Sequence, residues 1–288
     1  MNLEINNHLQ AYGIEVIASS NTNFDSELMK FIGGREILLP LVEVAKPLVF
    51  FIKNNSSKEV VGVSLRWNFV KPDGKTHIFP SGASSKGVLM GMKVRDPWMI
   101  GKTSLINSGD LRFFSHFGIS QTIENMNKSI KYGRFEYNRT PEDIQRDISY
   151  VEYQKKWMED VSGVSVSIDG IVFNDGTFVG EDKNFFFDST NGWIQARRDF
   201  IKTLREGKLS GKSDTEILEQ FISDVQERLP STGEYVDERD AFEKSYKRHL
   251  NYLKQGVKRR RTKFSDNVLV NEYLETQDSD FITVQKNK

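Results

Sequence analysis

Two stretches, each with two apolar runs separated by a polar turn, constrain the fold of this chain most strongly. The first is residues 47–70, PLVFFIKNNSSKEVVGVSLRWNFV, and the second is residues 164–179, VSVSIDGIVFNDGTFV. β-Branched and aromatic residues favour strands, whereas Asn, Asp, Ser and Gly between them favour turns. Each stretch therefore predicts two strands that meet at a tight bend, and the body of the protein is expected to be rich in β structure.

The two runs of the first stretch predict different kinds of strand. Residues 48–53 are apolar at nearly every position, as in a strand that is covered on both faces. Val61, Val63, Leu65 and Trp67 alternate with small or polar residues. This period of two predicts a half-buried strand whose inner face ends in the tryptophan.

Two further strands and one helix are predicted in the first 160 residues. Tyr12–Ala18 alternates as a strand does, and Glu36–Val44 reads as a strand interrupted at Pro40. Thr140 is a good N-cap, and the proline and acids that follow it suit the first helical turn. A helix over about residues 141–159 is therefore expected.

The pattern changes from strands to helices after residue 182. Trp193–Arg205 predicts a helix that ends at Gly207, and Ser213 begins a capping box that opens a second helix. Asp237–Gln255 predicts a third helix, which Gly256 is expected to stop.

Strands followed by helices predict an α+β fold, in which an antiparallel β-sandwich precedes a C-terminal segment of about three helices. The strand, Asn-rich turn and Trp-ending strand of residues 47–68 resemble the B and C strands of immunoglobulin-like or fibronectin type III-like sandwiches in bacterial surface and accessory proteins. The resemblance covers about residues 36–180. It implies a β scaffold, and it carries over no catalytic residue.

This interpretation divides the chain into four segments. It predicts a flexible leader, a sandwich domain with a helical insertion near 141–159, a helical segment packed on the sandwich, and a basic run followed by a polar tail. Their respective bounds are residues 1–10, 11–182, 183–256 and 257–288.

Composition excludes several chemistries. The chain has no cysteine, which excludes disulfides, thiol nucleophiles, thiolate zinc sites and iron–sulfur clusters. Its 40 basic residues balance 40 acidic ones, which argues against a whole-protein attraction to nucleic acids or anionic membranes. No signal peptide and no apolar run long enough for a membrane span are visible. We therefore expect a soluble cytoplasmic protein, or a secreted or periplasmic one if a leader was removed.

Three possible reaction centres fail on spacing. Residues 100–103, IGKT, carry the end of a phosphate loop, but Asp96 stands where its first glycine is required. Acidic and amide side chains cluster around the second hairpin without the alternation of a calcium loop; they are Asp169, Asn174, Asp175, Glu181 and Asp182. The histidines are dispersed, at positions 8, 77, 116 and 249. The sequence thus predicts no catalytic residue, no metal site and no cofactor.

Two clusters are candidate binding sites. The dense basic run consists of Lys254, Lys258, Arg259, Arg260, Arg261 and Lys263, and such a run can neutralise the phosphates of a nucleic acid. Alternatively, these cations complement a helix C-terminus or pair with the acidic tail. The aromatic cluster consists of Phe185, Phe186, Phe187 and Trp193. It either presents a patch to a partner protein or staples the helices onto the sandwich, and we favour the staple.

Three functions remain compatible with these patterns. The preferred hypothesis is a non-enzymatic binding or accessory protein that uses its β-sandwich for protein–protein interaction. The first alternative is a polyanion-binding protein that uses the basic run of residues 254–263. The second is a hydrolase whose site is assembled only in the fold.

Overall fold

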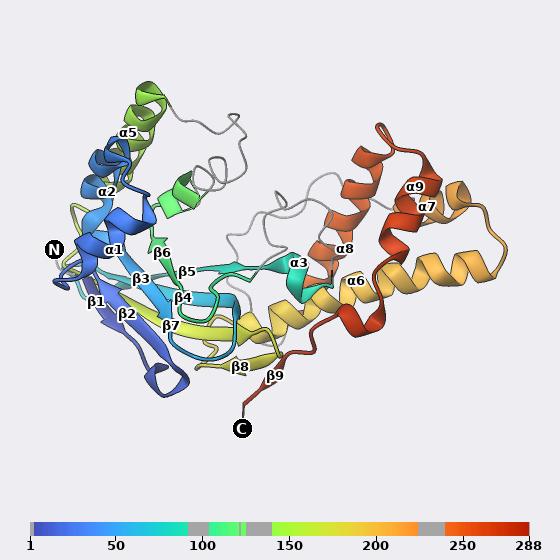
Figure 1. The fold of residues 1–288 in the computed structure, drawn as a ribbon, viewed down its shortest axis with the longest axis horizontal. Coiled ribbons are helices and arrows are strands. Elements are labelled where there is room, and N and C mark those ends of the chain that lie inside the picture. Colours follow the sequence, from blue (N-terminus) through green and yellow to red (C-terminus); the bar gives the residue numbers. More distant parts are fainter. Residues whose placement is uncertain (1–2, 92–103, 121, 125–139, 224–239, 288) are drawn as a thin grey trace. The chain divides into compact units, whose positions relative to one another are not determined.

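The computed structural model describes residues 3–91, 104–120, 122–124, 140–223 and 240–287, and the ribbon in Figure 1 is coloured along the sequence. These residues divide into two compact units. The first contains the described parts of residues 1–83 and 105–171, and the second those of 84–104 and 172–288. The division falls inside one strand, β7 (Gly163–Phe173), whereas the sequence suggested a boundary at residue 182.

Three strands form one antiparallel sheet of the first unit. They are β2 (Ile14–Ala18), β3 (Val49–Asn54) and β6 (Leu111–Ser115), in the order β2-β3-β6. The predicted strand over residues 12–18 is confirmed as β2. With a neighbour on each side, β3 is the central strand, and β2 forms one edge of the sheet.

Both faces of β3 are buried, as its apolar sequence predicted. The Phe51 ring lies 5.3 Å from the Phe24 ring at the start of α1 (Phe24–Phe31), so a helix covers one face. The next residue, Phe50, points to the other face, because side chains alternate along a strand. Its ring lies 5.9 Å from the ring of Trp67 in the second sheet.

The second sheet begins in the first unit with β1 (Leu3–Asn6), β4 (Val60–Val70), β5 (Thr76–Ser84) and β7. Their order is β5-β4-β7, and β1 pairs in parallel with the beginning of β7. Residues 1–10, expected to form a flexible leader, thus contribute a strand. The α+β class is confirmed, but this parallel pair departs from the antiparallel sandwich that was expected.

The polar turn between β3 and β4 connects two sheets and not the two strands of one hairpin. Both edges of β3 are already paired, with β2 and with β6, so β4 has no free edge of β3 to join. The Asn54 side chain holds the turn. Its Nδ2 donates to the carbonyl of Lys58 (2.7 Å), and its Oδ1 accepts from the hydroxyl of Ser56 (2.6 Å).

Trp67 lies between the two sheets of the first unit and is fully buried. Val61, Val63 and Leu65 are buried with it, as predicted, but Val60, Gly62 and Ser64 on the other face are buried too. The predicted half-buried pattern therefore holds only from Leu65 to the end of β4. The indole Nε1 donates to the hydroxyl of Ser81 at 3.0 Å.

Helices complete the first unit. Glu36–Val44 was predicted as a strand, and this prediction is wrong: the segment begins a helical stretch whose longest part is α2 (Leu39–Ala45). Pro40 stands in the first turn of α2, where its missing N–H has no helical partner to lose. The helix predicted after Thr140 is confirmed as α5 (Pro141–Lys156), which opens with a capping box.

The second unit is mainly helical. Its beginning is the end of β7, and the predicted Asp-Gly turn follows, with Gly176 at φ +87° and its amide donating to Phe173 (2.9 Å). The other elements of this unit are α3 (Lys86–Leu89), β8 (Thr177–Val179), α6 (Phe186–Leu209), α7 (Asp214–Ile222), α8 (Ala241–Arg260), α9 (Asp266–Leu274) and β9 (Gln285–Lys286). Short 3-10 segments of the whole chain are η1 (Gln10–Tyr12), η2 (Glu36–Leu38), η3 (Lys46–Leu48) and η6 (Asp278–Asp280).

Two glycines expected to stop helices do not stop them. Gly207 lies inside α6 and Gly256 inside α8, and the helices continue for two and four residues beyond them, respectively. Gly192 instead marks the close approach of these two helices. A Cβ atom there would lie 2.5 Å from the carbonyl oxygen of Phe242, so only glycine fits.

The segment predicted as a poorly ordered polar tail contains α9 and β9. Leu269, Val270 and Tyr273 recur at helical spacing and are buried. The Tyr273 ring lies 4.8 Å from that of Phe200 in α6, so the tail packs into the helical unit. Within the described residues, no helix is long and apolar enough to cross a membrane.

Candidate functional site

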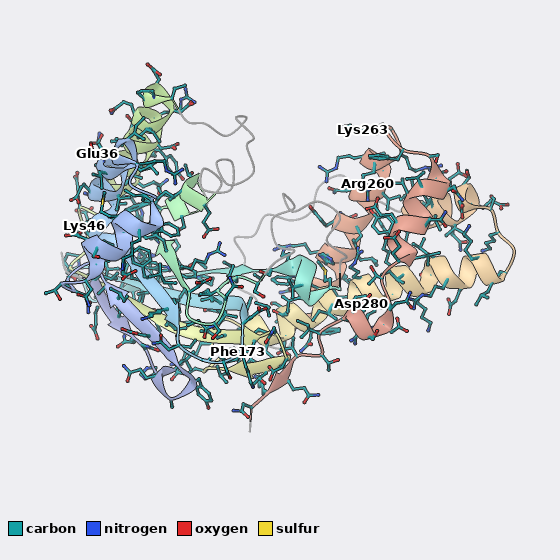
Figure 2. The ribbon with its side chains drawn as sticks, in the orientation of Figure 1. Glu36, Lys46, Phe173, Arg260, Lys263 and Asp280 are labelled. Atoms are coloured by element: carbon teal, nitrogen blue, oxygen red, sulfur yellow. The ribbon has the colours of Figure 1, made fainter. Side chains whose placement is uncertain are left out.

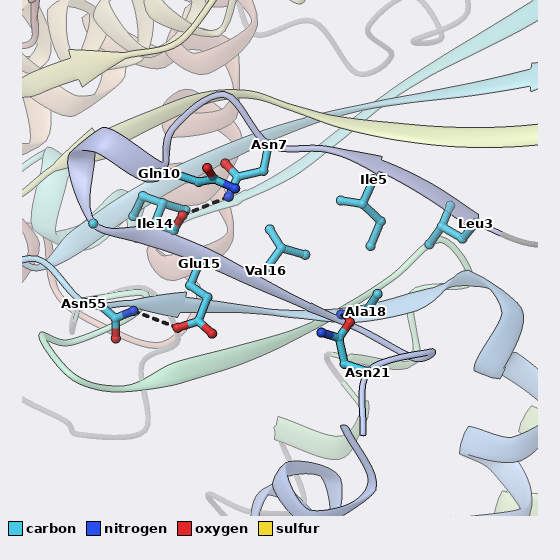
Figure 3. A pocket seen from close by; sticks show the side chains of 11 residues that line it. Leu3, Ile5, Asn7, Gln10, Ile14, Glu15, Val16, Ala18, Asn21 and Asn55 are labelled. Carbon is cyan, nitrogen blue, oxygen red and sulfur yellow. Dashed lines mark hydrogen bonds between the residues drawn. The ribbon is translucent and has the colours of Figure 1, made fainter. Parts of the chain in front are cut away.

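A groove of about 650 Å³ opens in the first unit between β1 and β2 (Figure 3). Leu3 and Ile5 line it from β1, and Val16 and Ala18 line it from β2. These two strands follow each other in the chain but join different sheets, so they diverge and do not pair. The groove is therefore flanked by two strands whose facing sides carry no neighbouring strand.

The register of β2 shows which of its backbone groups face the groove. The amide of Asn54 in β3 donates to Asp110 at 2.9 Å, so Asn54 faces away from β2. Ile14 lies opposite Asn54, and two opposed residues of an antiparallel pair either bond to each other or both face outward. Ile14, and by alternation Val16 and Ala18, therefore direct their N–H and C=O groups to the open edge.

Side chains near β2 form hydrogen bonds with the backbone at the two ends of this edge but not at its middle. The carbonyl of Ile14 accepts from Nδ2 of Asn7 at 2.8 Å, and the amide of Ala18 donates to Oδ1 of Asn21 at 3.0 Å. Among the described residues, no such partner stands opposite Val16. One N–H and one C=O thus remain available in the centre of the groove.

The rim of the groove is polar and is fixed by side-chain bonds. Nδ2 of Asn55 donates to Oε2 of Glu15 at 2.8 Å, which Figure 3 shows as a dashed line. Nζ of Lys53 lies 4.0 Å from the same carboxylate oxygen. At the turn into β2, Gly13 adopts φ +78°, and a Cβ there would lie 2.8 Å from the amide nitrogen of Ser56. The turn and the rim are therefore close-packed.

This arrangement suits binding better than proton transfer. Among the described residues, Glu15 is the one ionisable side chain that lines the groove, and Asn55 and Lys53 already engage its carboxylate. The apolar side chains of Leu3, Ile5, Val16 and Ala18 are half-buried. These side chains can contact the side chains of a ligand, and the backbone N–H and C=O of Val16 can bond to its main chain.

Sequence reasoning missed the groove. Its β2 side was predicted as a strand, but the β1 side was assigned to a loose leader. The alternation of Leu3 and Ile5 with Glu4 and Asn6 is the signal that could have found β1. A groove between strands of different sheets has no local signal, because it depends on how the strands pair.

The structure separates the basic run into cations with partners among the described residues and cations without; Figure 2 labels one of each, Arg260 and Lys263. Arg260 bonds Glu272 at 2.5 Å, and Arg261 makes two bonds to Asp266, at 2.8 and 2.7 Å. These two arginines join α8 to α9, as the alternative of pairing with the acidic tail proposed. Lys254 lies over a ring, with its Nζ 5.6 Å from the centroid of Phe221.

Lys258, Arg259 and Lys263, called here the exposed trio, are at the surface and have no ion-pair partner among the described residues. The helix that bears them does not stop at Gly256, so Lys258 and Arg259 lie within its last turn. Cations there complement the helix dipole. Of the six predicted polyanion ligands, these three remain available to a polyanion.

The aromatic cluster lies at the start of α6 and is half-buried. The Phe187 ring lies 5.6 Å from that of Phe178 in β8, and Phe186 lies 6.3 Å from Trp193. Phe187 therefore packs α6 onto a strand of the same unit, and Nζ of Lys286 covers its ring at 5.0 Å. The choice between a staple and a partner patch stays a prediction.

The other sequence candidates do not assemble into a reaction centre. The described residues contain no group of three or more His, Asp or Glu side chains that could hold a metal ion. Asp169 accepts a bond from Ser64 (3.2 Å) in the first unit, whereas Asp182 caps the Phe187 amide (3.0 Å) in the second. The phosphate-loop-like residues 100–103 lie outside the described residues.

His116 is half-buried in the first unit, and His249 is buried in the second. His116 directly follows β6, and its ring lies 5.2 Å from Trp67 and 4.8 Å from Phe69. Burial lowers the pKa of His116 to about 4. The ring is therefore neutral at pH 7 and packs as an aromatic side chain.

Comparison with known proteins adds no assignment to this site. No protein-family model, no curated protein and no solved structure matches the chain.

Proposed function

We propose that the protein is a non-enzymatic binding protein whose groove takes up a short extended segment of a partner protein as an additional strand beside β2. The observation that carries this proposal is the unpaired N–H and C=O of Val16 at the centre of an open strand edge. Such groups are a template for a strand from another chain. Backbone bonds then give affinity, and the side-chain contacts give selectivity.

The dimensions of β2 define the ligand. The strand has five residues, so at about 3.3 Å per residue it matches an extended segment of about five residues. Leu3 and Ile5 favour apolar side chains at alternate positions of that segment. Glu15 is the one charge that lines the groove, which favours a neutral or basic segment over an acidic one.

We further propose that the scaffold is an immunoglobulin-like sandwich. Two observations support this: β3 and β4 lie in different sheets, as the B and C strands of that fold do, and Trp67 is buried between the sheets. The parallel pairing of β1 with β7 is a local departure from the antiparallel form.

The test is a selection of random heptapeptides against the whole chain, followed by affinity measurements on the enriched sequences. Val16→Pro removes only an N–H that faces outward, and proline is tolerated at such edge positions. We expect this variant to lose binding of the selected peptides. Val16→Thr keeps the amide and the β-branched shape, so it is the matched control and should retain binding.

Two further measurements separate strand addition from ordinary side-chain contact. Hydrogen exchange at the Val16 amide should slow when peptide is bound, since that N–H gains an acceptor. Asn21→Ala frees the amide of Ala18 and should strengthen binding, because this second N–H can then donate to the bound peptide. Peptides that bind Val16→Pro as well as the wild type would contradict the proposal.

A further inference from the structure

A second site is suggested by basic side chains that gather in the second unit. They come from three helices: Lys86 from α3, Arg197 from α6, and Arg248 and His249 from α8. Arg197 is only 4% exposed and His249 only 6%. This cluster is distinct from the basic run, and it lies in the other unit from the groove.

The two buried members lack hydrogen-bond partners. Nε of Arg197 and Nε2 of His249 are inaccessible to solvent, and neither bonds to any described residue. A buried polar group without a partner is costly, and a buried charge more so. Such groups in a folded protein therefore point to a missing partner of complementary chemistry.

Among the described residues, the direct contacts of Lys86 and Arg197 are with aromatic rings. Nζ of Lys86 lies 4.4 Å from the centre of the Trp193 ring, and the Arg197 guanidinium lies 5.4 Å from the centre of the Tyr273 ring. Within the described part of the chain, Glu272 of α9 is the acid that acts electrostatically on Arg197, and that carboxylate is also bonded to Arg260. Glu272 is thus shared between two arginines, and as far as the structure describes the chain, the cluster carries more positive than negative charge.

The titration behaviour agrees with this geometry. Burial, and then the charges of Lys86 and Arg197, lower the pKa of His249 to about 3. Burial, and then Arg248, lower the pKa of Lys86. Burial lowers the pKa of Arg197 as well, against the opposing effects of Tyr273 and Glu272. Positive charges within the cluster thus lower the pKa of His249 and of Lys86.

We infer that this cluster is a binding site for a small anion that bears a phosphate group. A phosphate dianion carries two negative charges and several acceptor oxygens. It can therefore accept hydrogen bonds from several guanidinium N–H groups and balance more positive charge than one carboxylate can. Arg197 supplies the fork, and Lys86 and Arg248 add charge from the exposed side. Neutral His249 donates through one ring nitrogen.

The test measures binding of inorganic phosphate, pyrophosphate and sulfate to the whole chain by calorimetry, at constant ionic strength, with acetate as the carboxylate arm. We expect saturable binding of the phosphates and weaker binding of acetate. Removing a charged hydrogen-bond donor costs about tenfold or more in affinity, so Arg197→Gln should weaken binding by at least that factor. Lys86→Met removes the charge but keeps an aliphatic side chain beside Trp193, so it should weaken binding without affecting folding. Lys258→Met, in the exposed trio, is the matched control and should change nothing.

His249 supplies an independent readout. The chain has four histidines, so the carbon-bound ring protons can be followed one by one in an NMR titration. Sulfate stays a dianion across the pH range, and its binding should raise the pKa of His249 while leaving His116 unchanged. Binding that survives Arg197→Gln and Lys86→Met, or that leaves the His249 titration unmoved, would overturn the inference. Binding lost only in Lys258→Met would assign the anion to the basic run.

Discussion

Replacing Trp67 tests the packing of the two sheets in the first unit. The side chain is 0% exposed, and its ring contacts Phe50, Phe69 and His116 at centroid distances of 5.9, 6.5 and 5.2 Å. Emptying such a site costs about 3–5 kcal/mol, which includes the transfer of the ring and the cavity left behind. Because domains are stable by only about 5–15 kcal/mol, Trp67→Ala should remove a large part of the stability of this unit.

The assay is urea denaturation of the whole chain followed by far-UV circular dichroism. Trp157→Ala is the matched control, because this tryptophan contacts Phe69 at 5.5 Å but is 45% exposed. We expect the control to shift the midpoint by less than half as much as Trp67→Ala. Trp67→Phe keeps an aromatic ring and loses the bond to Ser81, so it should cost about 1–2 kcal/mol.

The same substitution should change the titration of His116. In the wild type, burial holds the pKa of this ring at about 4. A cavity at Trp67 admits water to the ring, and the pKa should rise toward its ordinary value of 6.5. An unchanged midpoint together with an unchanged His116 pKa would refute the assignment of Trp67 to the interface between the sheets.

Two other predictions concern pH and polyanions. Acid should destabilise the protein below pH 6.5, because the histidines of the unfolded chain are protonated there, whereas native His116 and His249 stay neutral until about pH 4 and 3. Each histidine then lowers the free energy of unfolding by about 1.4 kcal/mol per pH unit. Denaturation of His116→Gln and His249→Gln at several pH values should show a shallower pH dependence of stability than the wild type. Any binding of duplex DNA by the basic run should depend on the exposed trio. The logarithm of the binding constant should then fall with the logarithm of the salt concentration with a slope of about −2 to −3, and replacing the trio by glutamates should abolish binding. A steeper slope, or no binding at low salt, would remove this hypothesis in its present form.

Much of the local structure can be predicted from short stretches of sequence. The turn at Asp175-Gly176, the capping boxes at Thr140 and Ser213, and the burial of Trp67 all follow from residues within about one turn or one strand of each other. Their causes are equally local: glycine at positive φ, side-chain oxygens that accept helix amides, and apolar residues at a period of two. Predictions of this kind were confirmed.

Local signals failed where a distant partner decided the outcome. The apolar, β-branched segment around Pro40 suits a strand, yet it forms α2, whose Leu41 and Val42 are buried in the first unit. Gly256 can end a helix, yet α8 continues to its arginines, where Arg260 and Arg261 bond to acids of α9. Tertiary contacts of a few kcal/mol outweigh helix and strand propensities of less than one.

Both candidate sites belong to the part that only the tertiary structure decided. The sequence by itself determined that residues 14–18 form a strand, but only the pairing of β2 with β3 leaves Val16 at an open edge beside β1. Arg197 and His249 fall in two separate predicted helices, and the sequence of neither helix indicates that the two side chains are buried together. Their joint burial exists because Gly192 lets α6 approach α8 closely, and a contact between residues so far apart in the chain leaves no periodic trace in either segment.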